Sequence, residues 1–216
     1  MAPRMQAAEE AFQAAAFQAA AASLTWSLFS GDQDSLPLHA AAANNEGVEV
    51  VRRLLDANPD SVRETTPGGR LPLHVAAAKK APLEVVKLLL AADPAGARAT
   101  DIAGRLPLHH AASCYASAEV VQLLLDAYPV GAKATNCDGN LPLHYAAWDN
   151  APADVVRLVL DAYPAGASTA NSGKSLPLHY AVYRNGPEEV VRLLVLVGPG
   201  PNLLVGPGPN LPWART

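Results

Sequence analysis

The tetrapeptide Leu36-Pro37-Leu38-His39 is the first of five identical copies that decide the fold of this 216-residue chain. The other copies start at Leu71, Leu106, Leu141 and Leu176, so the interval is always 35 residues. A fixed period of about 20 to 50 residues is typical of a solenoid, because each unit is too small to bury its apolar face alone and stacks on its neighbours. We therefore expect any function to lie on the surface of a stack.

Each 35-residue unit contains the sequence pattern of two helices. Proline fits the first turn of a helix and cannot continue a helix interior, so the proline of each tetrapeptide predicts the start of a first helix. An acidic residue, two valines and leucines at helical spacing follow, and they predict a buried second helix that ends before a further proline. The residues expected to open this second helix are Pro82, Pro152 and Pro187, with Gly47 and Ser117 in the other units.

Glycines mark two turns in the long loop that follows each second helix. One set, two residues after the closing proline, predicts a turn with positive φ, and it consists of Gly96, Gly131 and Gly166. Another set, two residues before the next tetrapeptide, predicts a tight β-turn that projects from the stack. Its members are Gly69, Gly104 and Gly139, and in the fourth loop Gly173 sits one place earlier.

On these motifs, the unit resembles the ankyrin repeat, whose pattern is a β-turn, a Thr-Pro-Leu-His-x-Ala-Ala helix and a Val-Val-x-Leu-Leu helix. The resemblance covers about four fifths of the chain and implies an all-α solenoid of stacked helix-turn-helix units with β-turn loops. The chain departs from the family in its period, which is about 33 residues in ankyrin repeats, and in a Leu that replaces the Thr of every unit.

The change from Thr to Leu removes a hydroxyl that caps the first helix and is worth ~1 kcal/mol. In three units the residue just before the tetrapeptide has a polar side chain that is able to cap the first helix; these residues are Ser35, Asn140 and Ser175. Arg70 and Arg105 occupy this place in the other two units, where we expect backbone or histidine contacts to form the cap instead.

The pattern divides the chain into three segments. Residues 1–35 are expected to form an Ala-rich capping helix and linker, residues 36–197 five repeats, and residues 198–216 a tail rich in glycine and proline. The repeats are bounded as 36–70, 71–105, 106–140, 141–175 and 176–197, the last one with a truncated end.

The N-terminal segment has an alternative interpretation, because residues 11–31 carry no charge and resemble a signal or membrane helix. Their many alanines make the stretch weakly hydrophobic, and Glu9 and Glu10 stand where a signal peptide has positive charge. A helix that caps the first repeat is therefore the favoured interpretation, since terminal units of a solenoid need atypical covers.

The C-terminal tail contains a short duplication, Gly198–Val205 followed by Gly206–Trp213, whose glycines and prolines exclude a helix. The outer side of the last repeat needs a cover. We expect either the apolar residues of the tail to fold back over it or two chains to associate weakly there. The apolar residues are Leu203, Leu204, Val205 and Trp213.

Charge and cysteine content narrow the classes of partner and compartment. A net charge of −4 and a pI of about 5.8 argue against nucleic-acid binding, which calls for a basic stripe. Cys114 and Cys137 form neither a Cys-x-x-Cys pair nor a disulfide framework. A reduced cytoplasmic location is the simplest interpretation, with the nucleus also open, and no membrane partner or cofactor is expected.

Five evenly spaced histidines, one in each tetrapeptide, are the first candidates for metal binding or catalysis. Neighbouring repeats pack about 8 to 10 Å apart, whereas each ligand of a zinc ion lies about 2.0 to 2.1 Å from it. We therefore expect these histidines to bond the backbone of neighbouring loops. The chain has no Gly-x-Ser-x-Gly nucleophile motif and no phosphate-binding loop, so we expect no catalytic residue and no enzyme.

Binding is the remaining function, and the positions that vary within the constant frame indicate where it occurs. The resemblance to ankyrin repeats implies a concave face built from the β-turns and the exposed side of each first helix. Aromatic and arginine side chains are the usual anchors of protein interfaces. The candidate partner-binding residues are Lys79, Lys80, Arg105, Tyr115, Asp138, Asn140, Trp148, Asp149, Tyr183 and Arg184.

Two functional hypotheses follow from these observations. The leading one is a non-catalytic scaffold that binds a protein or peptide partner of unknown identity on the concave face. The alternative is the repeat portion, or a truncated fragment, of a larger protein whose activity resides in an absent domain. The variable positions themselves have another interpretation, which stays open: they are surface residues without a binding role. In that case Trp148 packs along its own helix.

Overall fold

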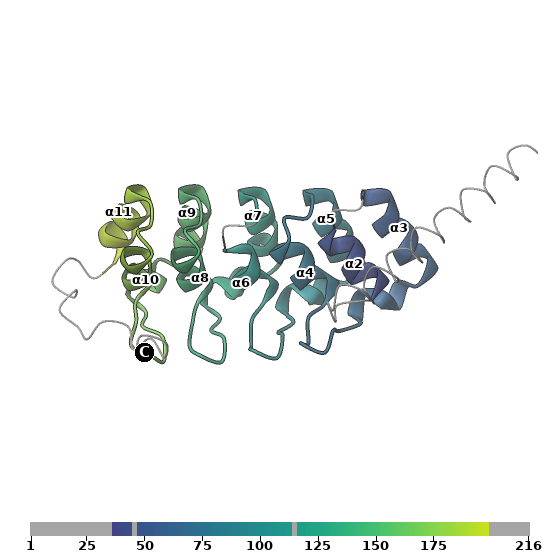
Figure 1. Ribbon diagram of the computed structural model, residues 1–216, viewed down its shortest axis with the longest axis horizontal. Coiled ribbons are helices and arrows are strands. Elements are labelled where there is room, and N and C mark those ends of the chain that lie inside the picture. Colours follow the sequence, from purple (N-terminus) through teal and green to yellow (C-terminus); the bar gives the residue numbers. More distant parts are fainter. Residues whose placement is uncertain (1–35, 45–46, 114–115, 199–216) are drawn as a thin grey trace, which may run out of the picture.

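The computed structural model describes residues 36–44, 47–113 and 116–198. In these ranges the chain forms two rows of short helices stacked in series, and the long loops project from one side (Figure 1). The first helices are α2 (Pro37–Ala43), α4 (Pro72–Ala78), α6 (Pro107–Ala111), α8 (Pro142–Trp148) and α10 (Pro177–Tyr183). The second helices are α3 (Val48–Ala57), α5 (Leu83–Ala92), α7 (Ala118–Ala127), α9 (Ala153–Ala162) and α11 (Glu188–Val197). The predicted all-α solenoid of stacked helix-turn-helix units is confirmed.

Helix starts follow the prolines, as predicted. Each first helix begins at the proline of its tetrapeptide, with the preceding leucine as the N-cap residue. The prolines expected to open the second helices serve as N-cap residues, so these helices begin one residue later, for example at Leu83. The missing N–H of proline costs nothing in either place, because no helical hydrogen bond requires it there.

The predicted positive-φ turn after the second helix is wrong. The chain forms a short 3₁₀ helix there instead: η1 (Pro59–Arg63), η2 (Pro94–Arg98), η3 (Pro129–Lys133) and η4 (Pro164–Ser168). Gly96, Gly131 and Gly166 lie within these helices and are not among the residues with positive φ. Two of them pack closely, because a Cβ on Gly131 or Gly166 would lie 3.0 or 3.1 Å from Cδ1 of the tyrosine three residues earlier, whereas one on Gly96 would meet no atom nearer than 3.5 Å.

The predicted β-turns are present and joined side by side. Gly69, Gly104 and Gly139 have φ angles of 70°, 74° and 75°, while Lys174, with φ 59°, takes this place in the fourth loop. Each turn donates a backbone hydrogen bond to the turn before it. The donors are the N–H groups of Ile102, Cys137 and Ser172, and the acceptors are the carbonyls of Gly68, Ala103 and Asp138, at 3.0–3.1 Å.

The core of the stack is made of small residues on the first helices and branched residues on the second. The two alanines after each tetrapeptide are buried, as Ala76 and Ala77 illustrate, and so are the valines and most leucines of α5, α7 and α9. The partly buried leucines of these helices are Leu83, Leu88, Leu123 and Leu158. The last repeat differs, because Val182 replaces the second alanine and is 52% exposed. No further repeat covers it within the described residues.

The five histidines of the tetrapeptides are here named the ladder histidines, and the last four of them close their first helices at the N-terminus. Ring Nδ1 accepts a hydrogen bond of 3.0–3.1 Å from the N–H of the leucine three residues earlier in the last four repeats. This ring nitrogen satisfies one of the backbone donors left open at a helix start.

The same histidines join each repeat to the next. Ring Nε2 bonds a loop carbonyl 31 residues further along the chain, at 2.8–3.1 Å. The acceptors are the carbonyls of Arg70, Arg105, Asn140 and Ser175, reached from His39, His74, His109 and His144. The expected contact with the backbone of neighbouring loops is confirmed.

The expectation that Asn140 and Ser175 cap the first helices is wrong, since neither side chain makes a cap hydrogen bond. The histidine inside the helix performs this task, and Oδ1 of Asn140 accepts a bond of 2.7 Å from Nδ2 of Asn171 instead. Ser35, the third expected cap, lies outside the described residues, as do the whole N-terminal segment and the tail from residue 199 onward. Among the helices described, none is long and apolar enough to cross a membrane.

A histidine inside the ladder should contribute more to stability than the last one. The substitution His109→Ala leaves the N–H of Leu106 and the carbonyl of Asn140 without their partner, and each such loss costs about 1–3 kcal/mol. We expect the free energy of unfolding, measured by urea denaturation, to fall by about 3 kcal/mol or more.

His179→Ala is the matched control. In the described residues, the His179 ring bonds the N–H of Leu176 and reaches no following loop. It should therefore lose about half as much stability as His109→Ala. Equal losses for the two variants would contradict the role of the ladder in joining repeats.

Candidate functional site

The residue before each of the last four tetrapeptides is held at both of its backbone groups. Its carbonyl accepts the bond from a ladder histidine, and its N–H donates to the side chain of the residue four places earlier, at 2.8–3.2 Å. We name these residues the presenting positions: Arg70, Arg105, Asn140 and Ser175. Their side chains therefore project from the same local backbone conformation in successive repeats.

A second set of residues braces the presenting positions, and sequence reasoning missed it. The brace has two parts in each repeat. The side chains that accept the N–H of the presenting position belong to Thr66, Asp101, Asn136 and Asn171. The residues nine places further along the chain, on the first helices, are Val75, His110, Tyr145 and Tyr180. Nδ2 of Asn136 and of Asn171 donates to the hydroxyl of Tyr145 and of Tyr180, at 3.1 and 2.8 Å. The signal was present in the sequence, because both sets recur every 35 residues and change together.

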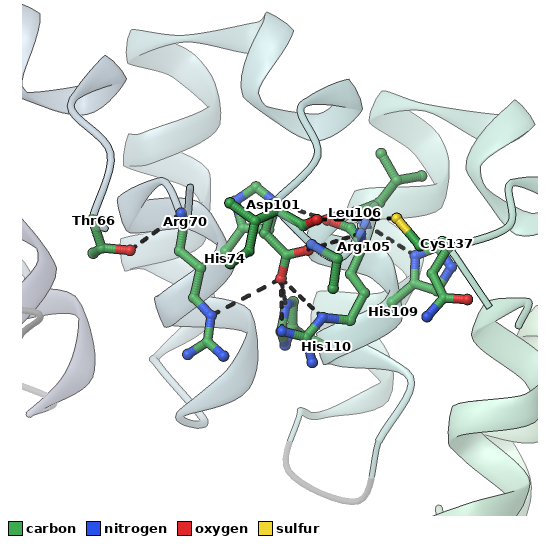
Figure 2. A network of polar contacts seen from close by, with 12 residues as sticks. Thr66, Arg70, His74, Asp101, Arg105, Leu106, His109, His110 and Cys137 are labelled. Atoms are coloured by element: carbon green, nitrogen blue, oxygen red, sulfur yellow. Dashed lines mark hydrogen bonds and ion pairs between the residues drawn. The ribbon is translucent and has the colours of Figure 1, made fainter. Parts of the chain in front are cut away.

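In the second loop, which precedes α6, the brace is ionic (Figure 2). The buried carboxylate of Asp101 accepts backbone bonds from Ala103 and Arg105 at Oδ1, and at Oδ2 it contacts the Arg105 guanidinium at 2.8 Å and Nε2 of His110 at 3.2 Å. Burial alone raises the pKa of Asp101, but the hydrogen bonds and charge of Arg105 outweigh it and lower the pKa to about 2. The carboxylate is therefore charged at neutral pH.

The buried histidines, in contrast, are neutral at pH 7. Burial lowers the pKa of His74, His109, His110 and His144 to about 4. For His110, the charge of Arg105 adds to this effect while Asp101 opposes it. A neutral ring has one donor and one acceptor nitrogen, which is what each ladder bridge requires.

Aromatic side chains gather on α8 and α10. Trp148 and Tyr183 occupy the same position of neighbouring repeats, and their rings stack with planes 13° apart and centroids 6.0 Å apart. Tyr180 meets Trp148 edge-on at 5.4 Å. Arg184 lies over the Trp148 ring at 4.9 Å and donates from Nε to the Trp148 carbonyl at 3.1 Å. Trp148 thus contacts the next repeat as well as its own helix.

A pocket of about 170 Å³ opens between these two helices. It is lined by Asn140, His144, Tyr145, Trp148 and Tyr180. Its wall is mainly aromatic, and its polar groups are uncharged, because burial lowers the pKa of His144 to about 4.

The structure places the predicted binding residues in several groups. Asn140 and Trp148 line the pocket, and Tyr183 and Arg184 stack beside it. Arg105 belongs to the ionic brace, and Asp138 is exposed on the β-turn beside Asn136. Three further residues follow the first helices: Lys79 at the C-cap of α4, Lys80 with φ 58°, and Asp149 at the C-cap of α8. Tyr115 lies outside the described residues.

Asp149 and the two lysines do not line the pocket. Burial raises the pKa of Asp149, and the nearby charge of Arg184 opposes the shift. Within the described residues, no cluster of three or more His, Cys, Asp or Glu side chains is arranged to hold a metal ion.

The geometry defines a helical repeat solenoid whose units are joined by histidine bridges. A family model for ankyrin repeats (3 copies) matches the chain at residues 11–101, 77–170 and 108–204. The chain therefore belongs to the ankyrin repeat family, whose members are generally protein–protein interaction modules and typically non-catalytic adaptors. No curated protein sequence matches it.

The buried histidines should make stability fall in mild acid. Their pKa in the folded state is about 4, below the ordinary value of about 6.5, so the unfolded chain takes up protons first as the pH falls. We expect the free energy of unfolding to be constant above about pH 7. Between about pH 6.5 and pH 4 it should drop by ~1 kcal/mol per pH unit for each ring.

The matched control is Asp101→Asn combined with His110→Tyr, which installs the Asn–Tyr brace of the next two repeats. It removes one of the four buried rings, so its stability should fall less steeply in this range when both proteins are titrated with urea. A wild-type stability that stays level between pH 6.5 and pH 4.5 would contradict the assignment of neutral buried rings.

Proposed function

We propose that the chain is a non-catalytic scaffold that binds a protein or peptide partner through its first-helix face. This face comprises the presenting positions together with Tyr145, Trp148, Tyr180, Tyr183 and Arg184. The observation that carries the proposal is the aromatic pocket between α8 and α10. Tryptophan, tyrosine and arginine in a partly desolvated pocket are typical of the anchor points of protein interfaces.

The size of the pocket favours a macromolecular partner over a small-molecule ligand. Sites for small molecules usually measure about 300–1,000 Å³ and bury most of the ligand. The pocket here, at about 170 Å³, is smaller and suits one apolar or aromatic side chain of a partner. Each tyrosine hydroxyl at its wall accepts a bond from an asparagine and retains an O–H that can donate to the partner backbone.

The groups with shifted pKa values support a structural role more than a catalytic one. His74, His109 and His144 use both ring nitrogens in backbone bonds, and Asp101 already accepts several hydrogen bonds. A catalytic acid or base needs a proton position open to substrate. We place the protein in the cytoplasm, since the exposed thiol of Cys137 suits a reducing compartment.

Self-association through the last repeat is a second proposal. Four large apolar side chains of α10 and α11 are exposed: Val182 at 52%, Tyr183 at 50%, Leu196 at 74% and Val197 at 42%. Apolar groups gathered at one end of a stack are typical of a contact surface. The contact is expected to be weak, because the surface is small.

Removing the aromatic anchors should weaken partner binding. The test is affinity capture from cell extract with wild type, with Trp148→Ala combined with Tyr183→Ala, and with Val130→Ala as a control. Val130 is exposed on η3, away from the pocket. We expect specific partners to be retained by wild type and control, and their Kd to rise at least about tenfold in the double variant. Identical partner sets for all three proteins would refute the proposal.

Self-association is tested by sedimentation velocity over a range of protein concentrations. Leu196→Glu places a charge on the exposed end of the stack and should lower the dimer fraction. Ile102→Glu is the control, since Ile102 is equally exposed, at 75%, on a β-turn of another repeat. A wild type that stays monomeric at the highest concentration, or equal effects of the two substitutions, would exclude this contact.

A further inference from the structure

Two arginines at consecutive presenting positions converge on one carboxylate. Nε of Arg70 lies 4.0 Å from Oδ2 of Asp101, and the Arg105 guanidinium lies 2.8 Å from the same oxygen. Figure 2 shows both arginine side chains directed toward Asp101, with His110 beside them. Residues 35 positions apart in the sequence thus form one cluster between repeats.

The cluster carries an excess of positive charge at its outer side. The Asp101 side chain is fully buried, whereas those of Arg70 and Arg105 are 36% and 24% exposed. His110 is neutral, because its pKa is about 4, so two positive charges face one negative charge. A guanidinium has five N–H donors, and Asp101, together with the Tyr145 hydroxyl that Arg105 also contacts, has too few acceptor sites for those of both arginines. N–H groups of the two guanidinium groups therefore remain available to bond a ligand.

The backbone structure of the loop does not require an acidic residue at the position of Asp101. Asn136 and Asn171 hold the next two presenting positions with the same backbone bond and are uncharged. The acid is found in the loop where arginines occupy neighbouring presenting positions. Its charge offsets the repulsion between two guanidinium groups that lie close together, and a buried ion pair of this kind is weak evidence for a stabilising role.

The backbones of both arginines are held in place before any ligand binds, and the Arg105 guanidinium is held by Asp101. The N–H of Arg70 donates to Thr66 and its carbonyl accepts from His39, while Arg105 is held in the same way by Asp101 and His74. A ligand therefore loses little binding energy to the ordering of the site. Paired guanidinium groups match the planar oxygens of carboxylates and phosphates.

We propose that Arg70 and Arg105 bind an anionic side chain of the partner, a carboxylate or a phosphate group. This inference rests on the proposed function, because it assigns the chemistry of one partner group on the same face. The arginine pair lies between the repeats of α4 and α6, and the aromatic pocket lies between those of α8 and α10. Two repeats span about 16–20 Å, which an extended segment covers with about five or six residues.

The partner segment should therefore carry an acidic or phosphorylated residue about five or six positions from an apolar anchor. The test starts with selection of random 12-residue peptides displayed on phage, with the full chain as bait. Wild type is compared with Arg70→Gln, Arg52→Gln and Trp148→Ala. Arg52 is exposed on α3 and far from the face in question, so its substitution controls for the loss of one positive charge.

We expect wild type and Arg52→Gln to enrich peptides with an acid at the stated distance from an apolar residue. Arg70→Gln should keep the apolar preference and lose the acidic one. Synthetic peptides with Glu, phosphoserine or Gln at the selected position then identify the source of the negative charge. The change from Glu to Gln should raise Kd about tenfold for wild type and leave it nearly unchanged for Arg70→Gln.

The outcomes separate the two proposals. Peptides that depend on Trp148 but carry no acid, or whose acid preference persists in Arg70→Gln, overturn the anion site and leave the binding face intact. Peptides that depend on neither residue, or no enrichment at all, overturn both. Thermal unfolding of Arg70→Gln checks that the fold is retained, which we expect because Arg105 still neutralises Asp101.

Discussion

The stack depends on neutral histidines that each form two hydrogen bonds to the backbone. One ring nitrogen closes the start of a helix, and the other reaches a loop of the next repeat, so helix capping and repeat stacking use the same side chain. The arrangement works for one protonation state only, because a charged ring has no acceptor nitrogen. Burial enforces that state by lowering the pKa of His74, His109 and His144 to about 4.

Much of the fold was predictable because its signals are local and repeated. Proline positions located the first helices, and glycines such as Gly104 located the β-turns. The cap was not predictable in the same way, because Asn140 has a suitable side chain and only the ring orientation of His144 shows which group bonds the helix start. Gly131 was also misread, since a glycine required for close packing looks the same in sequence as one required for positive φ.

The candidate site was only partly visible in the sequence. Trp148, Tyr183 and Arg184 were identified because they vary within a constant frame and are typical interface residues, and the structure brings them together. The convergence of two arginines on Asp101 was not predictable, because it joins residues from two loops and depends on how closely the repeats stack.

The braces have a consequence for how such a chain can diversify. Each loop residue that supports a presenting position and the helix residue that contacts it are nine places apart, with the presented side chain between them. A contiguous decapeptide, such as Asn136–Tyr145, therefore contains both a recognition group and the scaffold that aims it. Recombination between repeats can exchange this ten-residue segment as a whole. Ligand preference can then change from repeat to repeat while the helices keep their packing.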